Sequence, residues 1–179
     1  MTEKKKKGHR AYLEYFKKDE NGKYVFRGEY YSYCPEEGQT LRQVLVRMWT
    51  LCIVMLAAIV AAGCVPAPGM DRSFYVLLPY VAEMIGGIRV CLALGKLTTG
   101  GNLMKNYIYE GSVQELPPRT MFTMVCTVIA LVGEIVFLCR NGMEGKISGL
   151  VLFLVLEIIT GAALFLLRRL SLRMKWRKQ

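Results

Sequence analysis

The sequence predicts an all-α membrane protein, a bundle of four transmembrane helices preceded by a small cytoplasmic β-hairpin. First, 53% of the residues are hydrophobic, and most of these gather in four blocks, each about as long as the ~20 residues that cross a bilayer. Second, no block alternates apolar with polar residues, which argues against a β-barrel. Third, positive charge is concentrated before the first block, between the second and third blocks, and after the fourth. The predicted spans are residues 45–65, 74–97, 121–139 and 147–167.

Lysine and arginine residues favour one side of the predicted bundle. Eleven of the 24 lie before the first span or in its first turn, from Lys4 through Arg47. Three lie at the end of the second span or between it and the third, and six follow the fourth. This distribution follows the positive-inside rule, and it predicts that both termini and the middle connection are cytoplasmic. We therefore expect a basic arm with the hairpin over residues 1–43, the bundle over 44–168 and a basic tail over 169–179, all in a protein integral to the cell membrane.

The net charge of +10 is explained by this orientation rather than by nucleic-acid binding. Basic segments beside a span are attracted to anionic lipid, and no nucleic-acid recognition motif accompanies the charge. We therefore expect the lipid bilayer as a partner and no nucleic acid. The polar N-terminal segment contains no cleavable signal peptide, so the first span is expected to act as its own insertion signal.

A β-hairpin is predicted within residues 11–33. Two runs rich in aromatic and β-branched residues flank Asn21-Gly22, and Asn-Gly between such runs is the strongest short-range hairpin signal. The strands are expected near Tyr12–Lys17 and Lys23–Tyr31. An isolated hairpin is only marginally stable in water, so its tyrosines need a partner: lipid headgroups, the middle connection, a second copy or another protein. The alternative interpretation is a flexible arm.

Local signals mark the first span and the outer turn after it. Thr40 is expected to cap the first helix, and Trp49 lies at the depth of an interfacial aromatic anchor. Alanines in this span fit the small-xxx-small pattern of closely packed helices, although small residues are common in any spanning helix. Pro66, Pro68 and Gly69 are expected to end the helix in a short turn.

The middle connection is long for a helical bundle. Residues 98–102 are expected to break the second span, and Leu103–Tyr109 are expected to form a short amphipathic or interfacial stretch. Leu116–Arg119, which contain two prolines, are expected to turn into the third span. The basic tail after the fourth span is expected to carry Trp176 as a second aromatic anchor.

Four ionisable residues lie well inside the predicted spans, away from their ends, and they are the candidate site residues. A charge at the bilayer centre costs at least about 2.5 kcal/mol, so such residues must face the bundle interior or water, or be neutral. The four are Glu83, Arg89, Glu134 and Glu157.

The second span combines two of these residues with features that disturb a regular helix. Glu83 and Arg89 point about 120° apart, so Arg89 is expected to pair with a carboxylate or carbonyl of a neighbouring helix, or to extend toward the cytoplasm. Pro79 removes one backbone hydrogen bond, which predicts a kink near Glu83. Gly86-Gly87 would allow another helix to approach closely.

Two interpretations of the intramembrane acids remain open. In one, they form a path for protons or cations, or an acidic pocket for a cationic ligand. In the other, two of them are protonated and form hydrogen bonds between helices.

Signals of catalysis or metal binding are missing from the sequence. The one histidine, His9, lies in the basic arm, and no zinc, serine-nucleophile or phosphate-loop motif is present. The six cysteines have no CxxC spacing and are expected to be packing residues. A disulfide between Cys64 and Cys139 is the alternative. We expect no enzymatic activity, no cofactor and no metal site.

Three function hypotheses follow. The first is a non-enzymatic subunit or accessory of a larger membrane assembly, because the chain is short and its hairpin has aromatic surface to bury against a partner, either another protein or a second copy. The second is a small transporter or channel that works as an oligomer, with Glu83 and Glu157 on a proton or cation path. A membrane enzyme is the third, and the sequence favours it least.

Overall fold

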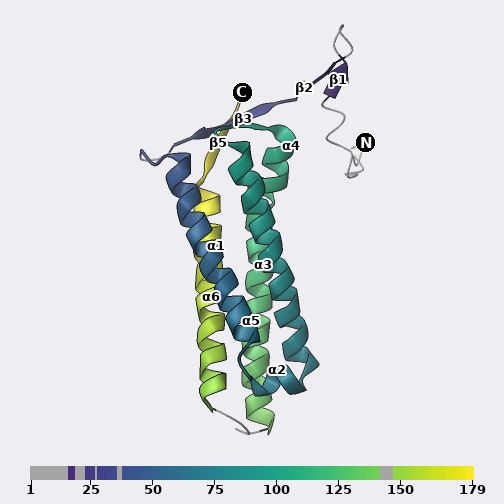
Figure 1. Cartoon of the computed structure of the whole chain (residues 1–179), viewed down its shortest axis with the longest axis vertical. Coiled ribbons are helices and arrows are strands. Elements are labelled where there is room, and N and C mark those ends of the chain that lie inside the picture. Colours follow the sequence, from purple (N-terminus) through teal and green to yellow (C-terminus); the bar gives the residue numbers. More distant parts are fainter. Residues whose placement is uncertain (1–15, 19–22, 27, 36–37, 142–146) are drawn as a thin grey trace, which may run out of the picture.

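A computed structural model describes residues 16–18, 23–26, 28–35, 38–141 and 147–179. Long helices run side by side in this part of the chain, and Figure 1 shows a small sheet with the C-terminus at one end of the bundle. α1 packs against α3 and α6, and α5 packs against the same two helices. The long helices are α1 (Leu41–Gly63), α3 (Phe74–Gly100), α5 (Leu116–Asn141) and α6 (Ile147–Arg173).

The four predicted spans are confirmed as helices that are long and apolar enough to cross a membrane. α1 begins with a capping box: the Gln43 backbone N–H donates to Oγ1 of Thr40, and the Gln43 side chain accepts from the Thr40 backbone. α3 continues through Pro79 as one helix. The Tyr75 carbonyl, which proline cannot bond, lies against α5, where a Cβ on Gly133 would come within 3.3 Å of it.

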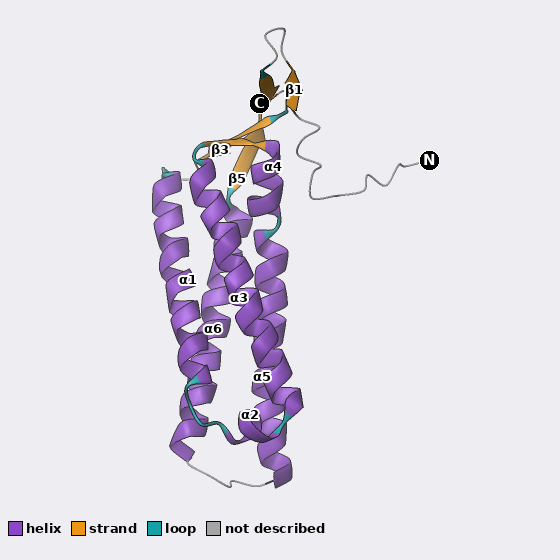
Figure 2. Ribbon diagram, turned by 45° about the vertical axis from the view of Figure 1, so that its right-hand side comes forward, coloured by secondary structure: helices purple, strands orange, loops and turns teal. Residues whose placement is uncertain are grey.

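Pro66 lies in the expected turn after α1, but three other prolines expected in turns stand at the beginning of helices. The outer turn contains a short helix that the sequence did not predict, α2 (Pro68–Arg72), and Pro68 is its first residue. Figure 2 shows α2 at the end of the bundle opposite the sheet. Pro117 and Pro118 likewise lie in the first turn of α5, so the predicted turn at Leu116–Arg119 is helical. In a first turn the missing N–H of proline costs no hydrogen bond.

The sheet joins three segments that are far apart in the sequence. Its strand order is β4-β3-β5, and both pairings are antiparallel. In this sheet Tyr31 lies opposite Met104 on one side and Lys178 on the other. The strands are β3 (Tyr30–Cys34), β4 (Leu103–Lys105) and β5 (Lys175–Lys178).

Two of these strands correct the sequence prediction. The stretch expected to be amphipathic or interfacial begins with β4, and α4 (Asn106–Tyr109) and a π-helical turn, η2 (Glu110–Gln114), follow it. The segment expected to be a simple basic tail continues α6 to Arg173 and then forms β5. Each strand is too short to be recognised from the sequence alone, and each pairs with β3, which lies between them.

The predicted hairpin is confirmed in part. β1 (Phe16–Lys18) pairs with β2 (Tyr24–Phe26) in antiparallel fashion, with Phe16 opposite Phe26. The predicted second strand is wrong in its length, because β2 ends at Phe26 and Tyr30 begins β3 in the other sheet. The Asn21-Gly22 turn, residues 12–15 and the basic arm lie outside the described residues.

Aromatic side chains hold the three-stranded sheet to the helical end of the bundle. The rings of Tyr31 and Tyr109 stack with their centroids 4.1 Å apart, and Trp176 lies edge-on to Tyr33 and Tyr109. The partner that β3 needed is therefore the chain's own middle connection and tail. At the edge of the sheet Lys178 Nζ lies 2.5 Å from Oε1 of Glu29, and this hydrogen bond raises the pKa of the Lys178 amine.

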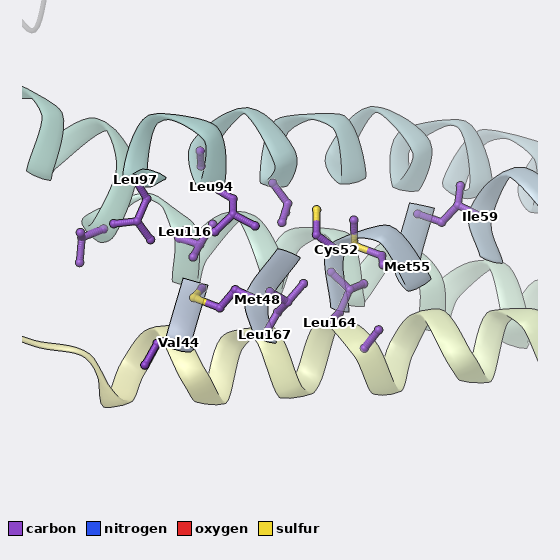
Figure 3. Packing of buried hydrophobic residues seen from close by; sticks show 14 of the residues in the cluster. Val44, Met48, Cys52, Met55, Ile59, Leu94, Leu97, Leu116, Leu164 and Leu167 are labelled. Atoms are coloured by element: carbon purple, nitrogen blue, oxygen red, sulfur yellow. The ribbon is translucent and has the colours of Figure 1, made fainter. Parts of the chain in front are cut away.

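The bundle interior is filled by large apolar side chains. Figure 3 shows part of this core, where Met48 and Met55 of α1 lie among residues of the other helices. Phe153 of α6 is also completely buried. The outer surface of the helices is apolar as well, since isoleucine, leucine, valine and phenylalanine side chains on all four are more than one-third exposed. The described cysteines are free thiols, so the predicted alternative of a Cys64–Cys139 disulfide is not formed.

Candidate functional site

Glu83 and Glu157 are buried inside the bundle, with 0% and 1% of their surface exposed. Both occupy core positions of their helices, because each belongs to a series of buried residues spaced three or four positions apart. The neighbouring members of the series are Tyr80 on α3 and Thr160 on α6. The helical period that builds the apolar core therefore also brings these two acids to the inside.

Glu83 connects three helices. Oγ1 of Thr127, on α5, donates a hydrogen bond to Oε1 of Glu83 over 2.8 Å. The Glu157 carboxyl, on α6, is in hydrogen-bonding contact with the Glu83 carboxyl. The Thr127 hydroxyl also lies 3.1 Å from the backbone carbonyl of Thr123. Its single proton is therefore shared between two acceptors, the Glu83 carboxyl on α3 and this carbonyl on α5. One polar cluster thus joins α3, α5 and α6.

The contact between the two carboxyl groups requires a proton. Carboxylate oxygens only accept hydrogen bonds, so two carboxyls in contact must hold at least one proton between them. Apart from this contact, no hydrogen-bond partner among the described residues reaches Oε2 of Glu83, Oε2 of Glu157 or Oγ1 of Thr160, and all three atoms are buried. Such orphaned atoms are costly in a protein interior. The carboxyl pair can therefore hold a proton.

Glu134 belongs to a different contact, at the end of the bundle where α2 lies. Its side chain is completely buried, and Oε1 accepts a hydrogen bond from the backbone N–H of Gly69 over 3.0 Å. The backbone N–H of Met70 donates to the same carboxyl group. These N–H groups begin a helix and have no partner within it. Glu134 therefore fastens α2 to α5, seven residues or about 10 Å along α5 from Thr127.

We predict that Gly69→Ala destabilises the protein, because a Cβ at this position would overlap the Glu134 carboxyl. The expected loss is about 1–3 kcal/mol of unfolding free energy, the usual cost of forcing an extra group into a packed site. Unfolding in mild detergent, followed by circular dichroism, measures it. Gly111→Ala is the matched control, since nothing lies within 4 Å of a Cβ there. Equal stability of the two variants would contradict the close contact.

Arg89 lies outside the bundle core, on the exposed face of α3. It lines a surface groove of about 210 Å³ between α3 and α5, together with Glu115, Arg119 and Phe122. Arg119 forms an ion pair with Glu115 and donates a hydrogen bond to the backbone carbonyl of Arg89 over 3.1 Å. The structure therefore separates Arg89 from the buried acids, whereas the sequence placed all four ionisable residues in one candidate set.

Sequence reasoning missed the hydroxyl groups of the cluster. Thr127 and Thr160 were not singled out, although both stand at buried positions of their helices, with 2% and 1% exposed. Tyr80 was also missed; its hydroxyl donates a hydrogen bond over 2.6 Å to the carbonyl of Ile59 on α1. The available signal was spacing, because Thr127 is seven residues from Glu134 and Thr160 is three from Glu157, which places each pair on one helical face.

Comparison with protein-family models, with curated proteins and with solved structures finds no match to this chain. Among the described residues, no group of three or more histidine, cysteine, aspartate or glutamate side chains is placed to hold a metal ion.

Proposed function

We propose that the bundle spans a membrane, with the sheet at its cytoplasmic end. The apolar outer surface supports this placement: Ile53, Ile88, Val128 and Ile158, one from each long helix, are each more than half exposed. A soluble monomer rarely exposes a continuous apolar surface over several helices, whereas lipid tails cover it at no cost.

The distribution of charge supports the orientation. Basic residues stand at the sheet end of the long helices, and few stand at the α2 end. The positive-inside rule assigns the more basic end to the cytoplasm. At the sheet end these residues are Arg42, Arg47, Lys96, Arg119, Arg168, Arg169 and Arg173, and at the α2 end the described ones are Arg72 and Arg140.

Cysteine labelling tests the orientation. In a chain whose six cysteines are replaced by alanine, Met70→Cys in α2 is expected to react with a membrane-impermeant maleimide added to intact cells. Ser32→Cys in β3 is expected to react only after the cells are opened. Reaction of Met70→Cys from the cytoplasmic side alone would contradict the orientation.

We further propose that the protein is a non-enzymatic subunit or accessory of a membrane assembly. The observation that carries this proposal is the sheet, because segments from before, between and after the spans fold together into one platform beyond the helices. β4 and β5 are its edge strands, and an edge strand can pair with a strand of another chain. The acids support it too, since Glu83 and Glu134 are held by groups of the chain itself.

The second candidate function is a proton- or cation-linked transporter that works as an oligomer. The specific observation in its favour is the contact between the carboxyl groups of Glu83 and Glu157, both buried inside the bundle. An interior carboxyl pair that exchanges a proton is a common device of proton relays.

Purification and flux assays separate the two functions. We expect the tagged full chain, extracted in mild detergent, to be recovered with a partner in fixed stoichiometry, as measured by native mass spectrometry. Removing residues 175–179, which carry β5, is expected to release that partner, while Lys178→Gln, which keeps the strand, is expected to retain it. Recovery of a lone homo-oligomer whose proton flux in liposomes disappears in Glu83→Gln would contradict the accessory role and establish the second function.

A further inference from the structure

A groove runs along the outer surface of the bundle between α1 and α6, at the end where the sheet lies. Its volume is about 500 Å³. Its floor is apolar, formed by Val46 and Leu51 of α1 and by Leu166 and Leu170 of α6. This groove is separate from the buried acids, which lie inside the bundle, and from the groove at Arg89 on the α3–α5 side.

Three arginines line the same groove. Arg47 stands on α1, and Arg169 and Arg173 stand one turn apart on α6, all with exposed side chains. A second cavity of about 290 Å³, toward the sheet, is also lined by Arg47 and Arg173. Among the described residues, the lining of either cavity includes no aspartate or glutamate, so within this part of the chain the three guanidinium groups share the groove without a lining acid.

The position of the arginines along the helices matches the level of lipid headgroups. Arg47 lies six residues, or about 9 Å, from the start of α1, and Arg169 lies one turn from the end of α6. From this level toward α2 the same faces stay apolar and exposed, as at Val54 and Ile159. The three arginines therefore lie at one end of an exposed apolar surface that extends along α1 and α6 toward α2.

One arginine is also held in place. Nη1 of Arg47 donates a hydrogen bond to Oε1 of Gln39 over 3.4 Å, and Gln39 belongs to the wall of the second cavity. Guanidinium groups bind phosphate oxygens in pairs of hydrogen bonds, so an ordered set of arginines is better suited to a phosphate than a general basic surface is.

We propose that this groove binds one anionic phospholipid of the cytoplasmic leaflet. The phosphate lies among Arg47, Arg169 and Arg173, and an acyl chain lies over Leu51 and Leu166 toward α2. Charge complementarity selects this occupant, because basic pockets between spanning helices on the cytoplasmic side fit acidic headgroups. The inference rests on the proposed membrane-spanning placement, but it requires neither the accessory nor the transport function.

Native mass spectrometry of the full chain in detergent tests this. The probes are dioleoyl phosphatidylglycerol and dioleoyl phosphatidylcholine, which have equal acyl chains and differ in charge. We expect one phosphatidylglycerol to be retained in preference to phosphatidylcholine. Arg47→Gln with Arg173→Gln is expected to weaken its binding about tenfold or more, since each arginine near a lipid surface contributes about 1 kcal/mol.

The control removes two positive charges from the sheet side of the bundle without touching the groove. Arg42→Gln with Lys96→Gln, two exposed residues at this end that line neither cavity, is expected to leave phosphatidylglycerol binding unchanged within about twofold. Equal weakening by the control pair would overturn the site in favour of general attraction, as would equal retention of the two lipids. Displacement of the lipid by inorganic phosphate would also overturn it, because it would identify an anion site. Extraction of the chain from membranes by alkaline carbonate would instead contradict the membrane placement, so the two failures are distinct.

Discussion

Replacing Glu83 by leucine is expected to lower the free energy of unfolding by about 1–2 kcal/mol, whereas replacing it by glutamine is expected to change it little. Leucine removes both the hydrogen bond from Thr127 and the contact with Glu157, and it leaves the Glu157 carboxyl buried without its partner. Glutamine keeps an acceptor for Thr127 and can donate its amide hydrogens to Glu157. Denaturant titration in mixed micelles gives the stabilities.

Met84→Leu is the matched control, because Met84 follows Glu83 on α3 but is exposed and does not belong to the cluster. It is expected to leave stability unchanged. A leucine variant at Glu83 as stable as the natural chain would contradict the three-helix connection. If glutamine were as damaging as leucine, the negative charge itself, rather than hydrogen bonding, would be the essential property of the pair.

The same variants separate structure from activity. If the pair is only a connection between helices, Glu83→Gln is expected to retain whatever the full assembly does. If Glu83 exchanges protons during function, Glu83→Gln is expected to abolish activity in a chain that is still folded. Measuring stability and activity on one preparation distinguishes these outcomes, which a single assay would confuse.

Gly86→Ala is expected to be the most damaging addition of a single methyl group to α3, with a loss of about 1–3 kcal/mol. A Cβ at Gly86 would collide with Oγ1 of Thr123 and would lie 3.2 Å from that residue's Cβ and Cγ2. Thr123 is completely buried, so α3 and α5 must move apart to make room. Thermal unfolding in detergent, compared with the natural chain, measures the loss.

Gly95→Ala is the control on the same helix, since nothing lies within 4 Å of a Cβ there. It is expected to be neutral or to stabilise by up to about 1 kcal/mol, because alanine favours a helix more than glycine does. Adding Thr123→Ala to Gly86→Ala is expected to recover most of the loss, because it removes Oγ1 and Cγ2. Additive effects of the two substitutions would contradict the contact.

The helices were predictable because their signals are local. Four apolar blocks of spanning length, the Thr40 cap and the Gly86-Gly87 pair each depend on neighbouring residues alone, and each appears in the structure as a helix, a capping box or a close contact. The burial of Glu83, Glu134 and Glu157 could also be predicted, since lipid strongly disfavours an exposed charge in a span.

Contacts between distant segments could not be predicted in this way. The partner of β3 is formed by residues more than 70 positions away on one side and 140 on the other, and strands this short carry too little local signal to reveal their pairing. Because of the hairpin signal at Asn21-Gly22, Tyr30 and Tyr31 were predicted to belong to the second strand of the hairpin, whereas they begin β3. The prolines at the start of α2 and α5 were predicted to lie in turns. A turn and the first turn of a helix both accept proline, so the local sequence does not distinguish them.

The roles of the four ionisable residues were also decided by tertiary structure. The sequence determined that each of them lies within a long apolar helix, but helix rotation decided which of them meet. Packing brought Glu83 to Glu157, turned Glu134 toward the backbone of α2 and left Arg89 on the surface. The apolar period specifies which face of a helix is buried, whereas the neighbour that this face meets depends on how all four helices pack together.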